Sequence, residues 1–302
     1  VNFIDGVPQP SPVIAEPGEE ALAYSALVLG VRDYLGKNGF PSAIIGLSGG
    51  IDSALTLAIA VDALGAERVR AVMMPSQFTL PMSLDDAQQM AQELRVRYDV
   101  LPIKPAFDAF LSTLAREFRG LPWDTTEENL QARIRGTLLM ALSNKYGSIV
   151  LTTGNKSETA VGYSTLYGDL AGGFAVIKDI LKTLVYRLCR YRNSISPVIP
   201  ERILLRAPTA ELKANQTDQD SLPPYDVLDE IIDLYMQQGR SIAEIVAADH
   251  DEAVVRKVVR MVRLSEYKRR QSPIGIRVTH RGFGRDWRYP VTNRFREESV
   301  TL

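Results

Sequence analysis

The sequence predicts an α/β protein with a doubly wound, open parallel sheet that carries helices on both faces. Along residues 43–153, short apolar runs alternate with longer segments whose apolar residues recur at helical spacing. Strands that alternate with helices favour a parallel sheet, because each helix returns the chain to the same edge. The chain has 302 residues, enough for one large domain with a full core.

The elements of the sheet are expected in a regular order. Strands are predicted over residues 43–47, 69–74, 99–103 and 148–153. Helices are predicted over residues 19–36, from residue 53 to about 65, and over 84–96, 107–118 and 125–145. Thr125 and Glu128 resemble a capping box at the start of the last of these helices. Loops 48–53, 75–83 and 153–158 leave the strands at their carboxyl ends, so all three should meet in one crevice.

The pattern changes after residue 160. Residues 162–179 are rich in glycine and tyrosine, a helix is expected over 180–190, and residues 197–206 are expected to be irregular. Residues 208–224 are polar and contain three prolines, which is typical of either a plain surface loop or a functional lid. Helices are expected over residues 227–238, 241–248 and 253–268.

Composition excludes several classes of protein. The net charge of −1 gives no global basic field to attract nucleic acid. A single cysteine, Cys189, excludes an internal disulfide framework and favours a reducing cytoplasm. No apolar run reaches the length of a membrane span, and no signal peptide is evident. Residues 1–20 contain four prolines among polar neighbours and are expected to be a linker, with one domain over residues 21–302.

The sequence around residues 46–53 predicts a phosphate site. A buried strand runs into Gly49 and Gly50, and a helix follows. Such a turn presents free N–H groups and the positive end of a helix dipole. Asp52 would repel phosphate unless a cation lay between them, so the loop predicts Mg²⁺ together with a polyphosphate. The loop is neither a Walker A motif nor the dinucleotide fingerprint.

The sequence Ser-Gly-Gly-Ile-Asp-Ser at residues 48–53 resembles the pyrophosphate loop of the N-type ATP pyrophosphatases. Further segments resemble the NAD synthetases, within a fold of the adenine nucleotide alpha hydrolase-like type. They lie at residues 127–136, 152–158, 162–169, 208–212, 216–225 and 266–271. Several look most like the synthetase domain of glutamine-dependent bacterial enzymes, which carry an amidase domain upstream. The proline-rich start is therefore expected to correspond to the linker between the two domains.

The resemblance implies a two-step ligation. The carboxylate of deamido-NAD attacks the α-phosphorus of ATP and releases pyrophosphate, and ammonia then displaces AMP from the acyl-adenylate to give NAD. A carboxylate is a poor electrophile, and adenylation gives it a good leaving group. No protein nucleophile is required, so catalysis would depend on positioning and charge stabilisation. The resemblance also implies a dimer at least and a glutaminase domain as covalent or associated partner. From the net charge and the lack of a long apolar run, no nucleic-acid or membrane partner is expected.

The resemblance assigns roles residue by residue. Asp52 and Glu158 are expected to bind Mg²⁺ and to be catalytic. The deamido-NAD site is expected to contain Asn129, Arg133, Glu158, Tyr267 and Lys268. Lys178 is a second choice for the phosphate-binding lysine. The ATP site is expected to contain Gly46, Leu47, Ser48, Gly49, Gly50, Ile51, Asp52, Ser53, Thr153, Lys182 and Thr209.

Three positions depart from the family pattern. The ammonia-dependent enzymes carry a lysine and an aspartate that contact deamido-NAD where this chain has Leu166 and Gly173, so those contacts are not assigned. The loop over residues 76–81 is more apolar than the serine-rich loop of the family, which leaves its phosphate contacts open. Cys189 is interpreted as a structural thiol, and His250 and His280 lack metal-ligand spacing.

Two alternatives remain open. The first is another enzyme with the same loop and the same adenylation step but a different substrate, such as a GMP-synthetase-like amidation or tRNA thiolation. Thiolation would need reactive cysteines and a basic surface for RNA. The second is a non-catalytic nucleotide-binding module, for which two carboxylates at the strand ends would be unnecessary.

Overall fold

The computed structural model describes residues 3–9, 16–284, 286–292 and 295. Its centre is a five-stranded parallel sheet, β3 (Ala43–Gly46), β4 (Val69–Met73), β5 (Arg97–Val100), β6 (Ile149–Thr152) and β7 (Phe174–Ala175). The strand order is β5-β4-β3-β6-β7, so the order reverses between β3 and β6. The predicted doubly wound sheet is confirmed, and ligands in such sheets bind beyond the strand ends at this reversal.

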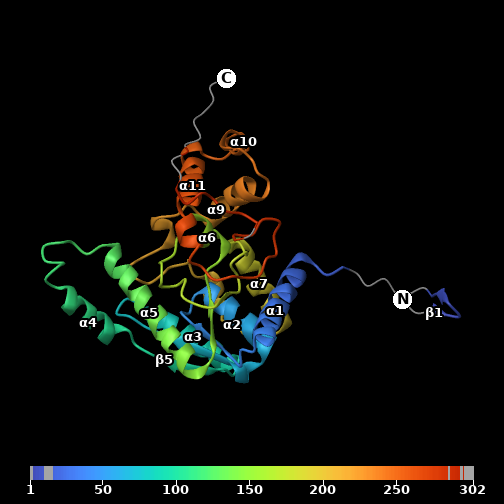
Figure 1. Cartoon of the computed structure of the whole chain (residues 1–302), viewed down its shortest axis with the longest axis horizontal. Coiled ribbons are helices and arrows are strands. Elements are labelled where there is room, and N and C mark those ends of the chain that lie inside the picture. Colours follow the sequence, from blue (N-terminus) through green and yellow to red (C-terminus); the bar gives the residue numbers. More distant parts are fainter. Residues whose placement is uncertain (1–2, 10–15, 285, 293–294, 296–302) are drawn as a thin grey trace.

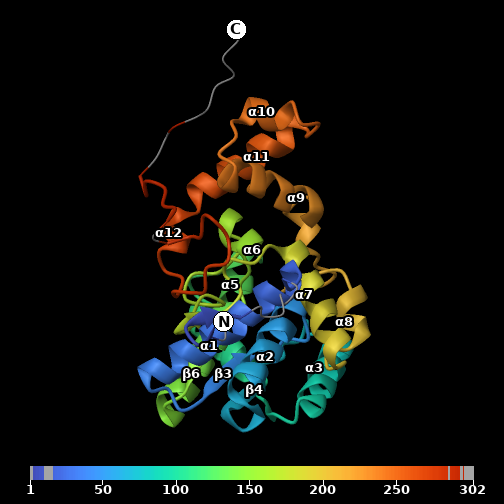
Figure 2. The ribbon, with the colours of Figure 1, turned by 90° about the vertical axis from the view of Figure 1, so that its right-hand side faces the viewer.

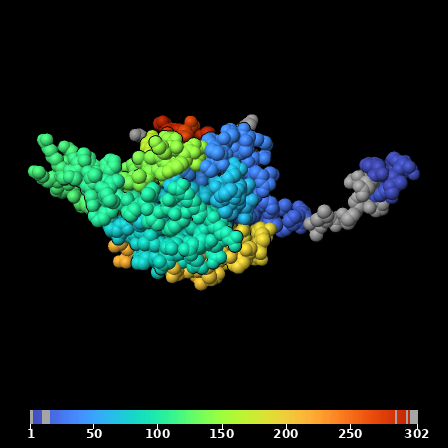
Figure 3. All heavy atoms as spheres, turned by 90° about the horizontal axis from the view of Figure 1, so that it is seen from below, coloured from blue at the N-terminus to red at the C-terminus, as the bar shows by residue number. Residues whose placement is uncertain are grey.

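Helices cover both faces of the sheet because neighbouring strand residues point to opposite sides. Ile45 belongs to a core with α1 (Glu19–Asn38), α2 (Ile51–Leu64) and α7 (Lys182–Ile195). Its neighbour Ile44 belongs to the opposite core, with α4 (Lys104–Leu114) and α5 (Thr125–Tyr146). Figure 1 shows α4 projecting from one side of the body, and the same projection appears from below in Figure 3.

A third core lies beyond the carboxyl ends of the strands. It joins α6 (Lys156–Val161), α9 (Tyr225–Ile232), α10 (Ile242–Val246) and α11 (Glu252–Leu264) through buried aliphatic residues such as Leu228. Figures 1 and 2 show these helices stacked at one end of the molecule, with α6 between the others and the sheet. Within the described residues, no helix is long and apolar enough to cross a membrane.

Two strands differ from the sequence-based expectation. β5 begins at Arg97 rather than at residue 99, because this edge strand is polar and partly exposed, and hydrophobicity does not mark it. β7 was not predicted, since it has only two residues. The Gly173 N–H donates to the carbonyl oxygen of Val150 at 2.9 Å, and a Cβ on Gly173 would lie 2.7 Å from the Ile149 side chain. Close packing against β6 therefore explains glycine at this departure from the family pattern.

Several helix boundaries also differ. The capping box of α5 is formed by Asp124 and Glu127, one residue earlier than predicted, because Asp124 is the residue with extended backbone before the first turn. α2 begins at Ile51 instead of residue 53. The segment expected to be irregular contains α8 (Glu201–Leu205), and the helix expected over residues 253–268 is divided into α11 and α12 (Glu266–Arg269).

Other regions complete the described chain. α3 (Pro81–Glu93) follows the loop after β4, and α9 continues as a π-helical turn over Asp233–Gln237. The 208–224 segment contains a 3₁₀ turn over Asp218–Asp220. Near the start, β1 (Phe3–Ile4) and β2 (Val7–Pro8) form an exposed hairpin that was not expected. The division into a linker and a domain at residue 20 stays a prediction.

Candidate active site

The glycine turn between β3 and α2 is braced by its two serines. Ser48 Oγ accepts from the Gly50 N–H at 3.2 Å, and Ser53 Oγ donates to the Gly50 carbonyl at 2.9 Å. The two hydroxyl oxygens lie 3.1 Å apart. Gly50 is the N-cap residue of α2, and no side chain caps this helix N-terminus. The first-turn N–H groups are therefore available to a phosphate, as the sequence predicts.

Gly49 is required where the turn passes α3. Its φ is +78°, and a Cβ at this position would lie 2.4 Å from the carbonyl oxygen of Ser83. Both the backbone conformation and the close approach favour glycine. The turn is thus fixed between β3, α2 and the first residues of α3.

Gly49→Ala is expected to weaken binding of a polyphosphate at this turn on the order of 100-fold, because moving the turn by about 1 Å misplaces its N–H groups. Gly147→Ala is a matched control, since Gly147 has φ +67° but open space around its Cβ position. That control should lose about 1–2 kcal/mol of stability from the left-handed backbone alone. Titration with inorganic triphosphate and thermal unfolding of both variants test this, and equal affinities in the two would contradict it.

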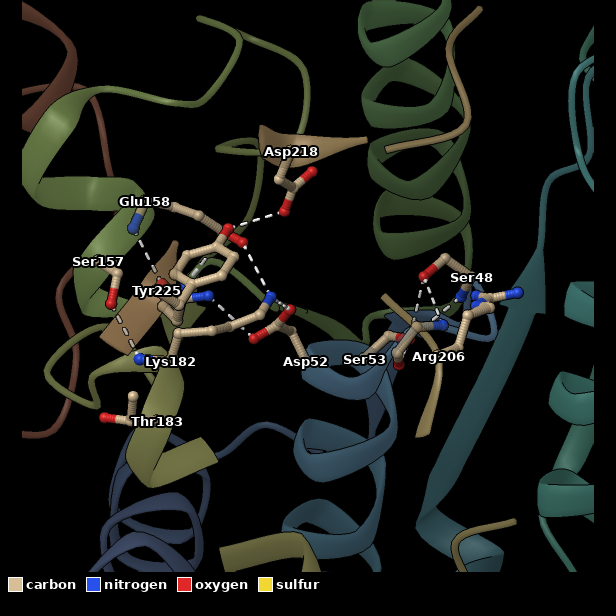
Figure 4. Close-up of polar contacts among 12 residues, drawn as sticks. Ser48, Asp52, Ser53, Ser157, Glu158, Lys182, Thr183, Arg206, Asp218 and Tyr225 are labelled. Atoms are coloured by element: carbon tan, nitrogen blue, oxygen red, sulfur yellow. Dashed lines mark hydrogen bonds and ion pairs between the residues drawn. The ribbon is translucent and has the colours of Figure 1, made fainter. Parts of the chain in front are cut away.

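Two carboxylates from different strand ends meet at one lysine (Figure 4). Lys182 Nζ donates to Asp52 Oδ2 and lies 3.4 Å from Glu158 Oε1. Asn155 Nδ2 donates to the other Asp52 oxygen at 2.9 Å. Asp52 lies in the first turn of α2, and Glu158 lies in the first turn of α6, which follows β6. The reversal of strand order therefore brings the two carboxylates together.

The electrostatics of this cluster are dominated by burial. Burial raises the pKa of Glu158 to about 8, with Lys182 opposing the rise and Asp52 and Asp218 adding to it. Lys182 is 2 % exposed, and its carboxylate partners raise its pKa despite the burial, so it stays charged. Its Nζ also lies 5.1 Å from the centroid of the Tyr225 ring, whose face favours a cation.

A second set of residues holds Lys182 in place. The Lys182 backbone N–H donates to Ser157 Oγ at 2.9 Å, and Ser157 Oγ donates to Asp229. The other Asp229 oxygen accepts from Thr183 N and Oγ1 at 2.8 and 2.9 Å. On the other side, the Tyr225 hydroxyl donates to buried Asp218 at 2.7 Å. These bonds connect α6, α7 and α9 around the lysine.

A cavity of about 620 Å³ lies over the turn and the carboxylate pair, between α5, α6 and the 208–224 segment. Among the predicted residues, Gly49, Arg133 and Tyr267 do not line it. Lys178 does not line it either, and its Nζ donates to the Pro273 carbonyl, so the geometry favours Lys182 as the phosphate-site lysine. The predicted residues that line the cavity are Gly46, Leu47, Ser48, Gly50, Ile51, Asp52, Ser53, Asn129, Thr153, Glu158, Lys182, Thr209 and Lys268.

The residues expected to contact the dinucleotide are only partly brought together. Asn129 Oδ1 accepts from Thr165 Oγ1 at 2.7 Å, and Lys268 Nζ donates to the carbonyl oxygens of Gly162 and Ser164. Arg133 Nε instead donates to the Leu166 carbonyl at 3.2 Å. Tyr267 is 49 % exposed on α12. The glycine- and tyrosine-rich residues 162–169 therefore connect α5 to the C-terminal part of the site.

Sequence reasoning missed several residues of the site. Asn155 lies in the segment 152–158, which carries the family resemblance, so the sequence could have marked it as a site residue. Its hydrogen bond to Asp52 could not be predicted, because the two residues are distant in the chain. Asp218 and Tyr225 lie near the carboxylate pair through folding of distant segments. Arg206 and Glu211 contact the start of α3, more than 100 residues away in the chain, and no local pattern indicates this.

Cys189, His250 and His280 do not line the cavity. Cys189 is fully buried in α7, and burial raises the pKa of its thiol, as expected for a structural residue. His250 lies near Glu230 at 3.6 Å. In the part of the chain that the structure describes, no group of three or more His, Cys, Asp or Glu side chains could hold a metal by itself.

The fold defines an α/β protein of the adenine nucleotide alpha hydrolase-like type, with the glycine turn and the carboxylate pair at the reversal of its strand order. The model of the NAD synthase family matches residues 23–272. The chain belongs to the NAD synthase family.

Relatives and solved structures agree with this assignment. The chain is 54 % identical over 277 residues to the glutamine-dependent NAD(+) synthetase of Acinetobacter baylyi, covering 91 % of this chain and 51 % of the relative. It is 54 % identical over 283 residues to that of Thermotoga maritima, covering 93 % and 49 %. The chain thus spans about half the length of these curated relatives.

Two solved structures cover most of the chain. The glutamine-dependent NAD+ synthetase of Acinetobacter baumannii in complex with adenosine diphosphate is 52 % identical, with a TM-score of 0.64 over 94 % of this chain and 51 % of the other. The NH3-dependent NAD synthetase of Campylobacter jejuni is 26 % identical, with a TM-score of 0.66 over 82 % of this chain and 94 % of the other.

Proposed function

We propose that this chain is a carbon–nitrogen ligase that amidates deamido-NAD to NAD at the expense of ATP, with AMP and pyrophosphate as the other products. The observation that carries the proposal is one cavity that contains both the open helix N-terminus at residues 48–53 and the Asp52–Glu158 pair. Family membership and the names of the curated relatives give the reaction class. A pure binding module would not need the two carboxylates.

The cavity suits a reaction that proceeds through positioning and charge. The glycine turn would hold the phosphates of ATP at the positive end of α2, with Thr153 and Thr209 lining the same cavity. Asn129 and Lys268 would receive the nicotinate end of deamido-NAD. Arg133 and Tyr267 lie outside the cavity lining, so a role for them requires that the dinucleotide extends beyond this cavity, as it would in the dimer that we propose. Adenylation would then precede attack by ammonia.

The carboxylate pair suits Mg²⁺. Asp52 and Glu158 both approach the ammonium group of Lys182, so their oxygens converge on one cationic position. Carboxylate oxygens completed by phosphates and water are the ligands that Mg²⁺ prefers. Held by the same two carboxylates beside Lys182, the ion would neutralise charge on the phosphates. Asp52 and Glu158 would hold it, and Asn155 would orient Asp52.

The partners follow from the reaction. We propose ammonia as the immediate nitrogen donor, supplied by a glutaminase domain that is covalently attached or associated. The name "glutamine-dependent" of the curated relatives supports this. We also propose a homodimer or larger homo-oligomer working in the cytoplasm.

The function is tested by direct assay. Purified chain is incubated with ATP, Mg²⁺, deamido-NAD and ammonium, and NAD, AMP and pyrophosphate are measured. Equal amounts of all three products are expected. A reaction that forms neither NAD nor pyrophosphate would reject the ligase proposal, and pyrophosphate without NAD would point to an adenylating enzyme for another substrate.

The 208–224 segment is expected to close on ATP. The Gln131 side chain donates to the Leu212 carbonyl at 2.9 Å, and Thr209 and Gln216 brace the segment internally. Limited proteolysis in this segment should therefore slow several-fold when ATP and Mg²⁺ are added. Cleavage in the exposed α4 region serves as an internal control that should not change. Equal cutting of the segment with and without nucleotide would argue against closure.

A further inference from the structure

Arg206 lies directly beside the glycine turn. Its Nη2 donates to the Gly49 carbonyl at 3.1 Å, and its Nη1 donates to Ser83 Oγ at 2.7 Å. The side chain is 17 % exposed and lines the same cavity as Ser48 and Ser53, next to which it lies in Figure 4. Arg206 is the C-cap residue of α8 and lies two residues before the start of the 208–224 segment. Its guanidinium is thus held at the phosphate end of the cavity.

The turn needs a cation that the motif itself does not supply. A Walker A loop carries its own lysine, and residues 48–53 contain none. Lys182 is close, but Asp52 and Glu158 already engage its ammonium group. Arg135 also lines the cavity, yet its Nε donates to the Met74 carbonyl rather than to the turn. Arg206 is therefore the arginine placed to meet the terminal phosphates, and guanidinium groups bind phosphate with two parallel N–H donors.

Glu211 provides the present counter-ion of Arg206. Its Oε1 accepts from Ser83 Oγ at 2.5 Å and lies 3.5 Å from Arg206 Nη1, and its Oε2 accepts from the Leu80 N–H at 3.2 Å. Glu211 is thus an anion that the 208–224 segment places against the phosphate end of the cavity. It has φ +51°, an unusual conformation for glutamate.

We propose that Arg206 binds the β- and γ-phosphates that leave ATP as pyrophosphate, and that Glu211 competes with them as a counter-ion contributed by the same segment that closes over the site. This inference rests on the proposed function and names the residue that holds the pyrophosphate released in the adenylation step. When phosphates enter, Arg206 exchanges its contact with Glu211 for phosphate oxygens. When pyrophosphate leaves, Glu211 returns. The carboxylate thereby weakens product binding and favours release.

The two residues are predicted to have opposite effects on pyrophosphate binding. Titration calorimetry of the full chain with pyrophosphate and Mg²⁺ should show that Arg206→Gln weakens binding tenfold or more. Arg206→Lys should recover part of the loss, because the charge remains while the forked geometry is lost. Glu211→Gln should tighten binding several-fold. AMP, which lacks the leaving phosphates, should bind equally to all variants.

The controls separate this proposal from a structural role and from the ligase assignment. Arg202→Gln changes an arginine of the same α8 that pairs with Asp86 instead of the turn, so it should leave pyrophosphate affinity unchanged. If Glu211→Gln weakens pyrophosphate binding as Arg206→Gln does, both residues merely support the turn and the proposal is wrong. Unchanged affinity in Arg206→Gln, or no pyrophosphate binding by the wild type, also overturns it. NAD formation by the wild type is measured separately, so failure of the ligase assignment remains distinguishable.

Discussion

Asp52→Ala is expected to abolish pyrophosphate release, by a factor on the order of 1,000 or more, while the chain stays folded. Asp52 lies at the junction of the phosphate turn and the carboxylate pair, where Asn155 and Lys182 fix both of its oxygens. Its removal takes away one of the two carboxylates that are proposed to hold Mg²⁺. Without the ion, the negative charge on the phosphates is not neutralised. Pyrophosphate release from ATP in the presence of deamido-NAD and ammonium is the measurement.

A matched control distinguishes loss of the site from loss of the fold. Asp62 lies on the same helix, pairs with Arg192 at 2.7 Å and accepts from the Tyr24 hydroxyl at 2.6 Å, away from the cavity lining. Asp62→Ala should lower the thermal midpoint yet retain catalysis. Asp52→Ala should also lower the thermal midpoint, because buried Lys182 loses one carboxylate partner, but of the two variants it alone should lose catalysis. Pyrophosphate release at the wild-type rate in Asp52→Ala would remove the carboxylate from the proposed mechanism.

Lys182→Met is expected to destabilise the protein by about 3–5 kcal/mol and to eliminate activity. The lysine is almost fully buried, and its removal leaves Asp52 and Glu158 close together without a cation. Breaking a buried ion pair by removing one partner typically costs this much. Chemical denaturation measures the stability, and the NAD assay measures the activity. A loss below about 1 kcal/mol would mean that the two carboxylates are well solvated without the lysine.

The stability loss in Lys182→Met should depend on pH. The pKa of Glu158 in the folded protein is about 8, above its ordinary value of 4.5, so the folded state binds more protons than the unfolded state between these pH values. Stability from this group therefore falls as pH rises through that window. Lys182 opposes the rise in pKa, so removing the lysine raises this pKa further and extends the fall to higher pH. The variant's extra loss of stability from this group should be nearly constant between pH 5 and about 7 and should grow as pH rises to 8 and above.

Lys156→Met provides the contrast for this pH dependence. Lys156 is fully buried and pairs with Asp179 at 2.6 Å, while Thr279 and the Arg281 carbonyl accept its remaining protons. The substitution leaves only one carboxylate, Asp179, without its lysine. Asp179 keeps other hydrogen-bond donors, because it also accepts from the N–H groups of Val278 and Thr279. The variant's stability loss should vary little between pH 5 and 8. Parallel pH profiles in both lysine variants would contradict the role given to Glu158.

The sequence by itself determined the doubly wound sheet, the phosphate turn and the presence of a carboxylate at the end of each of two strands. These features are local: a buried strand, two glycines and a helix start lie within a few residues, and strand order places their loops at one edge. The strands that the sequence missed or misplaced are those defined by pairing with a neighbouring strand and not by a local apolar run. β7 has two residues and is defined by its pairing with β6, and β5 is a polar edge strand.

Only the tertiary structure decided how the charges are arranged. Lys182 is 130 residues from Asp52 in the chain, and the hydrogen bond between them arises from packing of α7 beside α2. Arg206 reaches Gly49 from 157 residues away, and Glu211 reaches Ser83 from 128. Side-chain periodicity reports which face of an element is buried, but it carries no information about which distant side chain lies opposite. The sequence therefore predicted a site for phosphate and Mg²⁺, whereas the fold determined which cations and anions balance each other within it.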